Sequence, residues 1–143
     1  MSVKPIPQGY HTVTPYILVD GCHKFIEFLE KAFSAKVNNI HETNGKVLNA
    51  EISIGDSLVM VGDAPQGHKP NQAMFYLYVE DVDAMYKQAV SEGGESVQEP
   101  EDMFYGDRSG AVKDFSGNVW WIATHIKDVS EEELKEGMKK KKM

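Results

Sequence analysis

The chain has 143 residues, of which 41% are hydrophobic and 26% are charged, a balance typical of a folded domain rather than a disordered chain. It carries 15 basic and 22 acidic side chains, and residues 1–126 hold only 9 of the basic groups against 17 acidic ones. So acidic a body repels a phosphate backbone, and we expect no nucleic-acid partner. No apolar run approaches the roughly 18 residues that span a membrane, so no membrane partner is expected. A single cysteine, Cys22, and the lack of a visible secretory signal favour a cytoplasmic location.

The first half of the chain has a β-α-β-β-β pattern. Residues 12–19 are rich in β-branched and aromatic side chains and predict a strand. Apolar residues at helical spacing then predict an amphipathic helix over residues 21–33. Further strands are predicted over residues 36–41, 47–54 and 58–61, with a hairpin turn at Asn44-Gly45. Residues 62–72, which contain Pro65, Gly67 and Pro70, predict a linker.

The second half repeats this order about sixty residues later. A strand over residues 74–79 precedes a helix that begins near Val82 and is stopped by Gly93-Gly94. The elements predicted after it are a short strand over 96–98, a polar loop over 99–106, and strands over 109–113 and 119–124. The repeated order of elements indicates a duplicated module.

Four segments carry a resemblance to a known family: Thr14 to Ile17 (TPYI), residues 50–57 (AEISIGDS), Tyr105 to Gly110 (YGDRSG) and residues 114–125 (DFSGNVWWIATH). With the duplicated order, they resemble the vicinal oxygen chelate superfamily, which includes glyoxalase I, extradiol dioxygenases, and fosfomycin- and bleomycin-resistance proteins. The PhnB-like branch is the most similar. The family usually has Pro-Phe where this chain has Phe115-Ser116, so this turn is expected to differ.

The resemblance implies an α+β fold in which duplicated βαβββ modules form a cupped mixed sheet around a cavity. The modules would be about residues 10–62 and 73–126 of one domain over residues 1–126, followed by a charged helical tail over 127–143. In this tail Ser130 and Glu133 have the spacing of a capping box. We expect a homodimer, as is usual in the superfamily, because each module leaves a sheet face that needs a partner.

In metal-dependent members of the superfamily, four strand positions, two from each half, hold a divalent cation. The resemblance places these positions at Thr14, Val61, Met74 and Trp121. None of the four offers the imidazole or carboxylate that such a cation needs. We therefore expect no metal, no cofactor and no glyoxalase I activity, although a non-standard metal site stays open.

Strand alternation groups several aromatic side chains on one face of each half. Thr14 and Tyr16 share a face in the first half, and Tyr76 and Tyr78 share one in the second, with Trp121 on a neighbouring strand. Such a lining favours a flat, partly apolar small-molecule ligand. The alternative is that these side chains close the sheet as ordinary core.

Tyr105, Asp107 and Arg108 form the other candidate ligand-binding group. Arg108 is the only arginine, and beside an aspartate it would be able to clamp an anion with two parallel hydrogen bonds. This favours a small anionic ligand with an aromatic body. The alternative is a structural ion pair at the edge of a strand.

Two further residues are candidates for acid–base chemistry. Glu51 is a candidate general base if its face of the strand lines the cavity, and an ordinary charge if that face is solvated. His125 follows the last strand and either rims the cavity or is a satisfied histidine at a strand end.

Three functions follow from these observations. The first is a metal-free protein that binds a small molecule, like the bleomycin-resistance members. The second is a lyase, an isomerase or another enzyme of the superfamily that uses acid–base residues or a non-standard metal site. The third is a structural partner that uses its sheet surface. The missing metal ligands favour the first.

Overall fold

The computed structural model describes residues 3–140. The chain divides into two compact units at the boundary between Gln72 and Ala73. Each unit has the order β-α-β-β-β and forms its own four-stranded mixed sheet, and the second unit ends in an additional helix. The α+β class and the duplicated modules predicted from the sequence are confirmed.

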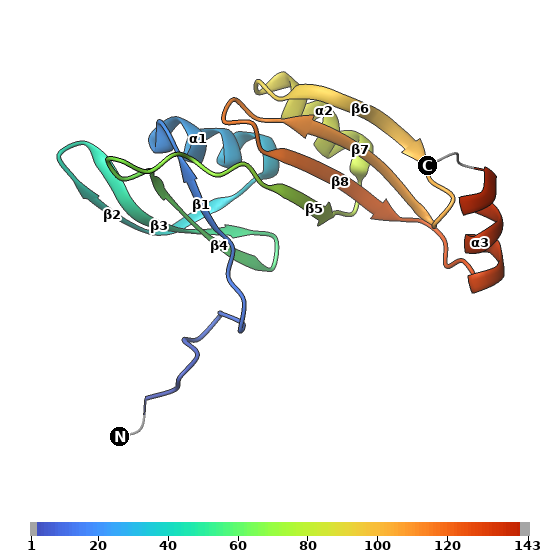
Figure 1. Ribbon diagram of the computed structural model, residues 1–143, viewed down its shortest axis with the longest axis horizontal. Helices are drawn as coiled ribbons and strands as arrows, with labels where there is room; N and C mark the ends of the chain where they lie inside the picture. The colour runs from blue at the N-terminus through green and yellow to red at the C-terminus, as the bar shows by residue number, and fades with distance from the viewer. Residues whose placement is uncertain (1–2, 141–143) are drawn as a thin grey trace. The chain divides into compact units, whose positions relative to one another are not determined.

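The first unit is drawn in blue to green in Figure 1. Its elements are β1 (Tyr16–Val19), α1 (Cys22–Phe33), β2 (Lys36–Thr43), β3 (Lys46–Ile54) and β4 (Ser57–Asp63). The strands lie in the order β1-β4-β3-β2, with β1 parallel to β4 and the other neighbours antiparallel. Asn44 and Gly45 form the β2–β3 turn with positive φ angles of 50° and 76°, as their sequence predicts.

Helix α1 covers one face of the first sheet because its apolar stripe meets a matching row of strand side chains. Phe25, Leu29 and Ala32 of this stripe are fully buried. The buried strand residues of this face are Ile17, Val19, Ala50, Ile52, Val59 and Val61. The Asp63 carboxylate accepts hydrogen bonds from the backbone amides of Cys22 (3.0 Å) and Val47 (2.8 Å), which ties the start of α1 to the sheet.

The second unit runs from yellow-green to red in Figure 1. Its elements are β5 (Met74–Tyr78), α2 (Val82–Ser91), β6 (Glu95–Asp102), β7 (Asp107–Lys113), β8 (Val119–His125) and α3 (Glu131–Lys140). The strands lie in the order β5-β8-β7-β6, which repeats the order of the first sheet. Again the first strand is parallel to its neighbour, and the other pairs are antiparallel.

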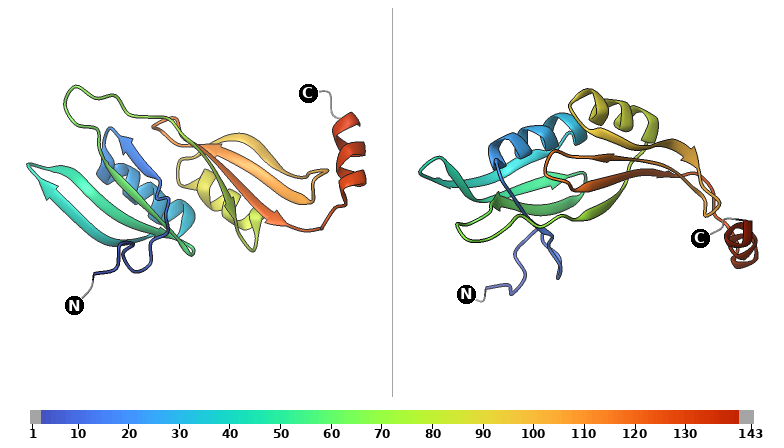
Figure 2. Two further views of the ribbon diagram at one scale, coloured as in Figure 1. Left: turned by 60° about the horizontal axis from the view of Figure 1, so that its bottom comes forward. Right: turned by 45° about the horizontal axis from the view of Figure 1, so that its top comes forward.

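Helix α2 covers one face of the second sheet (Figure 2). Thr124 fastens the start of this helix to β8, because its hydroxyl accepts from the Val82 amide (2.9 Å) and donates to the Val79 carbonyl (2.8 Å). On the same side Trp120 is buried and stacks on Phe75, with ring centroids 4.4 Å apart. We call the opposite side of this sheet the far face.

The β7–β8 turn is organised by a buried carboxylate. Asp114 accepts hydrogen bonds from the backbone amides of Ser116 and Asn118 and from the Trp120 indole at 2.8 Å. Asn118 in turn accepts from the Ala73 amide. These bonds connect the turn to the core tryptophan and to the beginning of β5.

Helix α3 begins with the predicted capping box: the Ser130 hydroxyl accepts from the Glu133 amide, and the Glu133 carboxylate accepts from the Ser130 amide. A Cβ on Gly137 would lie 2.4 Å from the Phe104 ring, so the glycine allows α3 to contact the β6–β7 turn closely. The last three residues of the expected tail, 141–143, lie outside the described part of the chain. Over residues 3–140, no helix has the length and apolar character that crossing a membrane requires.

The largest differences from the expected strand boundaries are in β1 and β6, and β7 begins two residues earlier than expected, at Asp107. β1 begins at Tyr16 rather than residue 12, directly after a proline, which has no N–H to donate to a ladder. β6 extends through the first half of the predicted loop, since Pro100 is accommodated on an edge strand where the β6–β7 register shifts. A Cβ on Gly110 would lie 3.0 Å from the Pro100 nitrogen, so the bare glycine makes room for this irregular strand.

Candidate functional site

Exposed aromatic rings line the far face of the second sheet. Tyr76 lies opposite Trp121 in the β5–β8 pair, and their rings are nearly parallel with centroids 6.5 Å apart. Tyr78 follows on the same strand face, 5.3 Å from the Tyr76 ring. Tyr76 is 41% exposed and Tyr78 is 64% exposed, so neither ring is core. The interpretation that these tyrosines close the sheet as ordinary core is therefore wrong.

A buried carboxylate holds both tyrosines. Asp107, at the start of β7, is only 3% exposed. One of its oxygens, Oδ2, accepts hydrogen bonds from the Tyr76 hydroxyl (2.7 Å) and the Tyr78 hydroxyl (2.9 Å). Its other oxygen lies 2.8 Å from Nδ1 of His125, the residue directly opposite in the β7–β8 pair. We refer to Tyr76, Tyr78, Asp107 and His125 as the Asp107 cluster.

The donors around Asp107 keep it ionised. Burial alone would raise the pKa of this carboxyl, but the hydrogen bonds from His125, Tyr76 and Tyr78 outweigh it and lower the pKa below the ordinary value. The pKa of Tyr76 is raised by burial and then by its bonds to Asp107 and Tyr105, and the pKa of Tyr78 by its bond to Asp107. The phenols therefore stay protonated and continue to donate.

His125 is held between two carboxylates. Its Nδ1 contacts Asp107, and its Nε2 lies 2.7 Å from Oδ1 of Asp128, whose side chain is 100% exposed. Hydrogen bonds to Asp128 and to Asp107 raise the pKa of the imidazole. His125 therefore lies at the end of a strand with a hydrogen-bond partner for each ring nitrogen, as the second interpretation predicts. Its side chain is nevertheless 48% exposed.

A glycine sets the position of Asp128. Gly106 has a φ of 98°, and a Cβ there would lie 2.1 Å from the Lys127 carbonyl oxygen. The Gly106 carbonyl accepts hydrogen bonds from the amides of Ile126 (2.9 Å) and Lys127 (3.1 Å). The β6–β7 turn thus holds the segment after β8 close enough for Asp128 to reach His125.

Small side chains occupy the centre of the far face. Ser109, Ala111 and Ala123 lie in register between the larger residues described above, and all three are fully buried. The Ser109 hydroxyl has no hydrogen-bond partner among the described residues. A buried polar atom without a partner lowers the free energy of unfolding, and the full burial of Ser109 keeps its hydroxyl from the surface of the far face.

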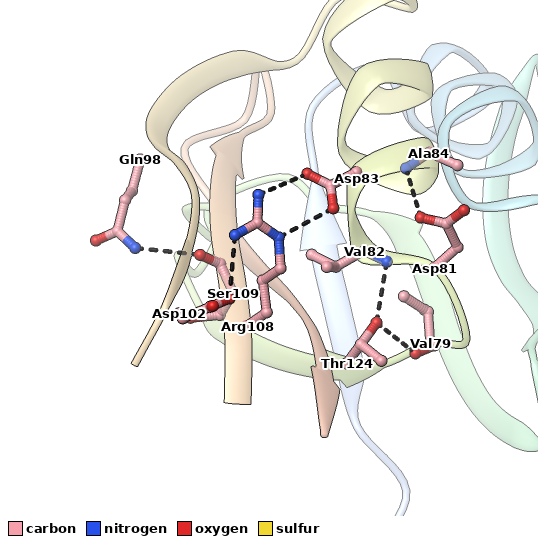
Figure 3. A network of polar contacts seen from close by, with 10 residues as sticks. All are labelled: Val79, Asp81, Val82, Asp83, Ala84, Gln98, Asp102, Arg108, Ser109 and Thr124. Carbon is pink, nitrogen blue, oxygen red and sulfur yellow. Dashed lines mark hydrogen bonds and ion pairs between the residues drawn. The ribbon is translucent and has the colours of Figure 1, made fainter. Parts of the chain in front are cut away.

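Arg108 does not join the Asp107 cluster. Adjacent residues of a strand point to opposite faces, so Arg108 lies on the side covered by α2. Its guanidinium donates to both oxygens of Asp83 on α2, each at 3.0 Å, and to Asp102 at 3.1 Å (Figure 3). The expectation that Arg108 and Asp107 bind one ligand together is corrected by this geometry, and the structural ion pair is the arrangement found.

Three candidate residues lie in the first unit. Thr14 precedes β1 and is partly exposed, and Tyr16 lies on the sheet face opposite α1, where its hydroxyl donates to the Leu48 carbonyl at 3.2 Å. Glu51 shares that face, opposite Met60 in the β3–β4 pair. Burial and then the neighbouring Glu51 raise the pKa of Tyr10. Glu51 thus lies on the face of the first sheet that α1 does not cover, and its role as a base stays a prediction.

The residues at the superfamily's metal positions do not fit a metal. Trp121 lies opposite Tyr76, but Tyr16 lies opposite Met60, so the counterpart of Trp121 is Met60 rather than Val61, which is buried under α1. The Met74 sulfur accepts a hydrogen bond from the Trp121 indole at 3.2 Å. Within residues 3–140, no three His, Cys, Asp or Glu side chains are arranged to hold a metal ion.

Asp128 is the residue of this site that sequence reasoning missed, and no motif marks it. The pairing of Asp107 with His125 did have a signal. Extending the hairpin outward from the turn at Ser116-Gly117 pairs Lys113 with Val119, and three pairs further on the same face it pairs Asp107 with His125. The sequence also predicts Tyr105 as a ligand-binding residue. In the structure its side chain hydrogen-bonds with Tyr76 and helps to raise the pKa of that phenol.

The comparisons with known proteins agree with this fold. A family model described as Glyoxalase/Bleomycin resistance protein/Dioxygenase superfamily matches residues 10–122. An uncharacterised protein of Mycobacterium bovis is 28% identical over 138 residues, which cover 88% of this chain and 91% of that protein.

Solved structures show the same architecture. TioX from Micromonospora sp. ML1 has a TM-score of 0.68 at 19% identity, covering 84% of this chain and 100% of that one. A PhnB protein from Bacillus cereus has a TM-score of 0.62 at 13% identity, covering 80% of this chain and 99% of that one. At these identities the likeness concerns the fold alone.

Proposed function

The chain belongs to the glyoxalase/bleomycin resistance protein/dioxygenase superfamily, and from that premise we propose that it is a metal-free protein that binds a small molecule on the far face of its second sheet. One observation carries the proposal. Tyr76 and Tyr78 expose their rings while one buried carboxylate holds both of their hydroxyls. Fixed hydroxyls restrict the rings, so a ligand would meet a surface that is already in place.

The chemistry of the far face favours a planar, largely apolar ligand. Tyrosine and tryptophan rings stack on flat groups, and each such contact contributes roughly 0.5–1.5 kcal/mol beyond the area it buries. The polar groups nearby are those of the Asp107 cluster. Because Arg108 is paired with Asp83 on the other side of the sheet, an anionic group on the ligand is not part of the proposal.

The proposal of metal-free binding rests on donor chemistry. A thioether, an indole and a threonine hydroxyl are poor ligands for the hard or borderline cations of this superfamily. Of these groups, Met74 and Trp121 already contact each other. Ligand binding should therefore be unchanged by chelators.

A fluorescence screen tests the proposal. Trp120 is buried on the α2 side, so tryptophan emission that changes in the wild type but not in Trp121→Phe reports on the far face. We expect planar compounds from a fragment library to quench it in protein treated with EDTA, and native mass spectrometry to find one ligand per chain. Tyr78→Ala should weaken binding about tenfold, the loss of one stacking contact. Phe115→Ala, which removes an exposed ring from the β7–β8 turn, is the matched control and should not.

The screen also defines what would contradict the proposal. Binding that needs added divalent metal would exclude the metal-free mode. Equal affinities of the wild type and the Tyr78→Ala protein would place the ligand elsewhere.

We also propose that two copies of the chain associate and that the protein works in a reducing, cytoplasmic compartment. Every residue of the edge strand β2 is exposed, which leaves a sheet edge available for a second copy. The single thiol, Cys22, is buried, and burial followed by the nearby Asp63 raises its pKa to about 12. Such a thiol is not reactive, and it suits a compartment where disulfides are not used.

A further inference from the structure

His125 contacts two carboxylates, one through each ring nitrogen. Nδ1 lies 2.8 Å from Oδ1 of Asp107, and Nε2 lies 2.7 Å from Oδ1 of Asp128. An ionised carboxylate only accepts hydrogen bonds, and a neutral imidazole has a single N–H to donate. Both contacts are therefore hydrogen bonds only when the ring carries a second proton. The arrangement in the structure is that of an imidazolium ion.

The two carboxylates differ in their freedom to move. Asp107 is 3% exposed and accepts from the hydroxyls of Tyr76 and Tyr78, so it is fixed in the sheet. Asp128 is fully exposed, and His125 is its only hydrogen-bond or ion-pair partner within residues 3–140. Where one of the two contacts has to break, it is the contact with Asp128.

Loss of a proton from the ring breaks this contact. Asp107 stays ionised, because its donors lower its pKa, so Nδ1 keeps its hydrogen and continues to donate. Nε2 then presents a lone pair to the Asp128 carboxylate, 2.7 Å away. Two acceptors at this distance repel each other, and the exposed side chain turns toward water.

Asp128 lies where the segment between β8 and α3 is held to the sheet. Before it, the amides of Ile126 and Lys127 donate to the Gly106 carbonyl. Over residues 128–130, the bond to His125 is the one hydrogen bond or ion pair that reaches the sheet in the described part of the chain. Helix α3 begins directly after this segment, at Glu131.

We propose that His125 is a latch operated by pH: its imidazolium form fastens residues 128–130 to the second sheet, and its neutral form releases them. In the fastened state Asp128 covers Nε2. In the released state Nε2 is an open hydrogen-bond acceptor at the end of β8, and the segment that carries α3 is free of the sheet. The latch works whether or not a ligand is bound to the far face.

The groups that face His125 set the pH at which the latch opens. The carboxylates of Asp128 and Asp107 raise the pKa of the imidazole above its ordinary value of about 6.5. The segment is therefore fastened below this raised value and released above it. The other titratable side chains of the surrounding elements pair among themselves or with Asp107: Tyr76 and Tyr78 of β5 donate to Asp107, and Lys127 pairs with Glu133 of α3.

Nitrogen-15 NMR of the full chain tests the latch directly. The imidazole shifts of His125 show which nitrogen carries a hydrogen, and we expect both to do so at about pH 5.5. The neutral form should keep its hydrogen on Nδ1. The heteronuclear NOE values of the Asp128 and Val129 amides should decrease with the same midpoint. A neutral form with its hydrogen on Nε2, or NOE values that stay constant through the His125 titration, would overturn the proposal.

Three variants assign the transition. The amide of Asp128→Asn can accept from Nε2–H or donate to the Nε2 lone pair, so this variant should keep high NOE values at both ends of the titration and lower the His125 midpoint. His125→Gln should show no transition. Glu131→Gln, which removes a nearby exposed acid, is the matched control and should behave as the wild type does. A decrease in the NOE values of Asp128→Asn at the wild-type midpoint would assign the transition to another group and contradict the latch.

Discussion

Asp107 organises the far face at the scale of single residues. Its two oxygens receive three donors from two other strands, β5 and β8. A buried carboxylate with this many donors is stabilised in its charged form, and it fixes the side chains that donate to it. The exposed rings and the histidine are thus positioned by one group that a ligand would hardly touch.

Removing one of these donors should destabilise the protein. Tyr76→Phe deletes a 2.7 Å hydrogen bond to the ionised Asp107, and we expect a loss of about 1.5 kcal/mol in the free energy of unfolding, at the low end for charged partners because Tyr76 is partly exposed. Urea unfolding measures it. Tyr16→Phe, which deletes an exposed 3.2 Å bond to a carbonyl, should cost less than half as much. Equal losses of unfolding free energy in Tyr76→Phe and Tyr16→Phe would show that the hydrogen bond to Asp107 stabilises the protein no more than an ordinary surface bond.

The His125 pairs should make stability depend on pH. The folded-state pKa of His125 is raised, so the stabilisation is fully present below the ordinary value of about 6.5 and is lost as pH rises through the folded-state value. Asp107 has a lowered pKa, so its stabilisation is lost only when pH falls through that lower value. Urea midpoints measured upward from about pH 6 should therefore decline in the wild type and in His68→Gln, a linker control. A decline that persists in His125→Gln would assign it to another group.

The sequence identified most residues of the site but not their partners. Composition singled out Arg108 as the sole arginine, yet its direction depends on which strand face it occupies. The sequence places residues 107 and 108 between a predicted loop and a predicted strand. In the structure β7 already begins at Asp107, and this sends the two side chains to opposite faces of the sheet. Asp128 carries no pattern at all, because its contact with His125 depends on the close approach at Gly106.

At the scale of elements, two turns position the site. The first is the β7–β8 turn, where Asp114 accepts bonds from two amides and from the Trp120 indole. Asp114→Ala would leave these buried donors without an acceptor, and we expect a loss of about 3 kcal/mol or more in the free energy of unfolding. Asp56→Ala, in the exposed turn before β4, should change it by about 0.5 kcal/mol or less. Thermal and urea unfolding measure both variants. Similar losses of stability in Asp114→Ala and Asp56→Ala would contradict this role of Asp114.

The second turn joins β6 to β7. Gly106→Ala places a methyl group against the Lys127 carbonyl, so the segment that carries Asp128 must move. We expect a loss of more than the roughly 1–2 kcal/mol due to positive φ alone, together with a lower His125 pKa followed by NMR. Gly45→Ala also has a positive φ but no atom within 4 Å of the new Cβ, and it should lose only the conformational part. An unchanged His125 pKa in Gly106→Ala would show that the turn does not hold Asp128.

The elements themselves could be predicted because most depend on local pattern. Helical spacing of apolar residues predicted α1 and α2, and alternation of apolar and polar residues predicted β3. Each of these patterns arises because the element buries one side against a single neighbouring layer. β6 was not predicted at its full length. Pro100 can lie in a strand because Gly110 on the neighbouring strand leaves room for it, and this contact between distant residues is not visible in a local sequence pattern. The sixty-residue repeat also misplaced the counterpart of Trp121 by one position, which in a strand is a change of face.

At the scale of the whole molecule, the chain shares the fold of its superfamily. The positions that the resemblance assigns to a metal carry Thr14 and Met60 in the first unit and Met74 and Trp121 in the second. Within the second unit, the Asp107 cluster lies on the same sheet face as Trp121. Function depends on the site rather than on the fold, so the family alone does not identify the ligand.

The proposed association of two copies is tested at the same scale. The chain has a mass of 16.0 kDa, and we expect light scattering to give about twice that value at micromolar concentration. A charge placed in the exposed edge strand, Ile40→Lys, should favour the monomer if β2 lies at the interface, whereas Val97→Lys on β6 is the matched control. A single 16.0 kDa species in the wild type would contradict the proposal.

Methionine methyl NMR tests the central claim most directly, because the chain carries its own reporters. Met74 is 70% exposed on the far face, whereas Met85 lies on α2. In protein labelled at the methionine methyl groups and treated with EDTA, a planar compound from the fluorescence screen should shift the Met74 signal through its ring current and leave Met85 unchanged. Saturable binding with no shift at Met74, or a shift that appears only after a divalent metal is added, would contradict a metal-free site on the far face.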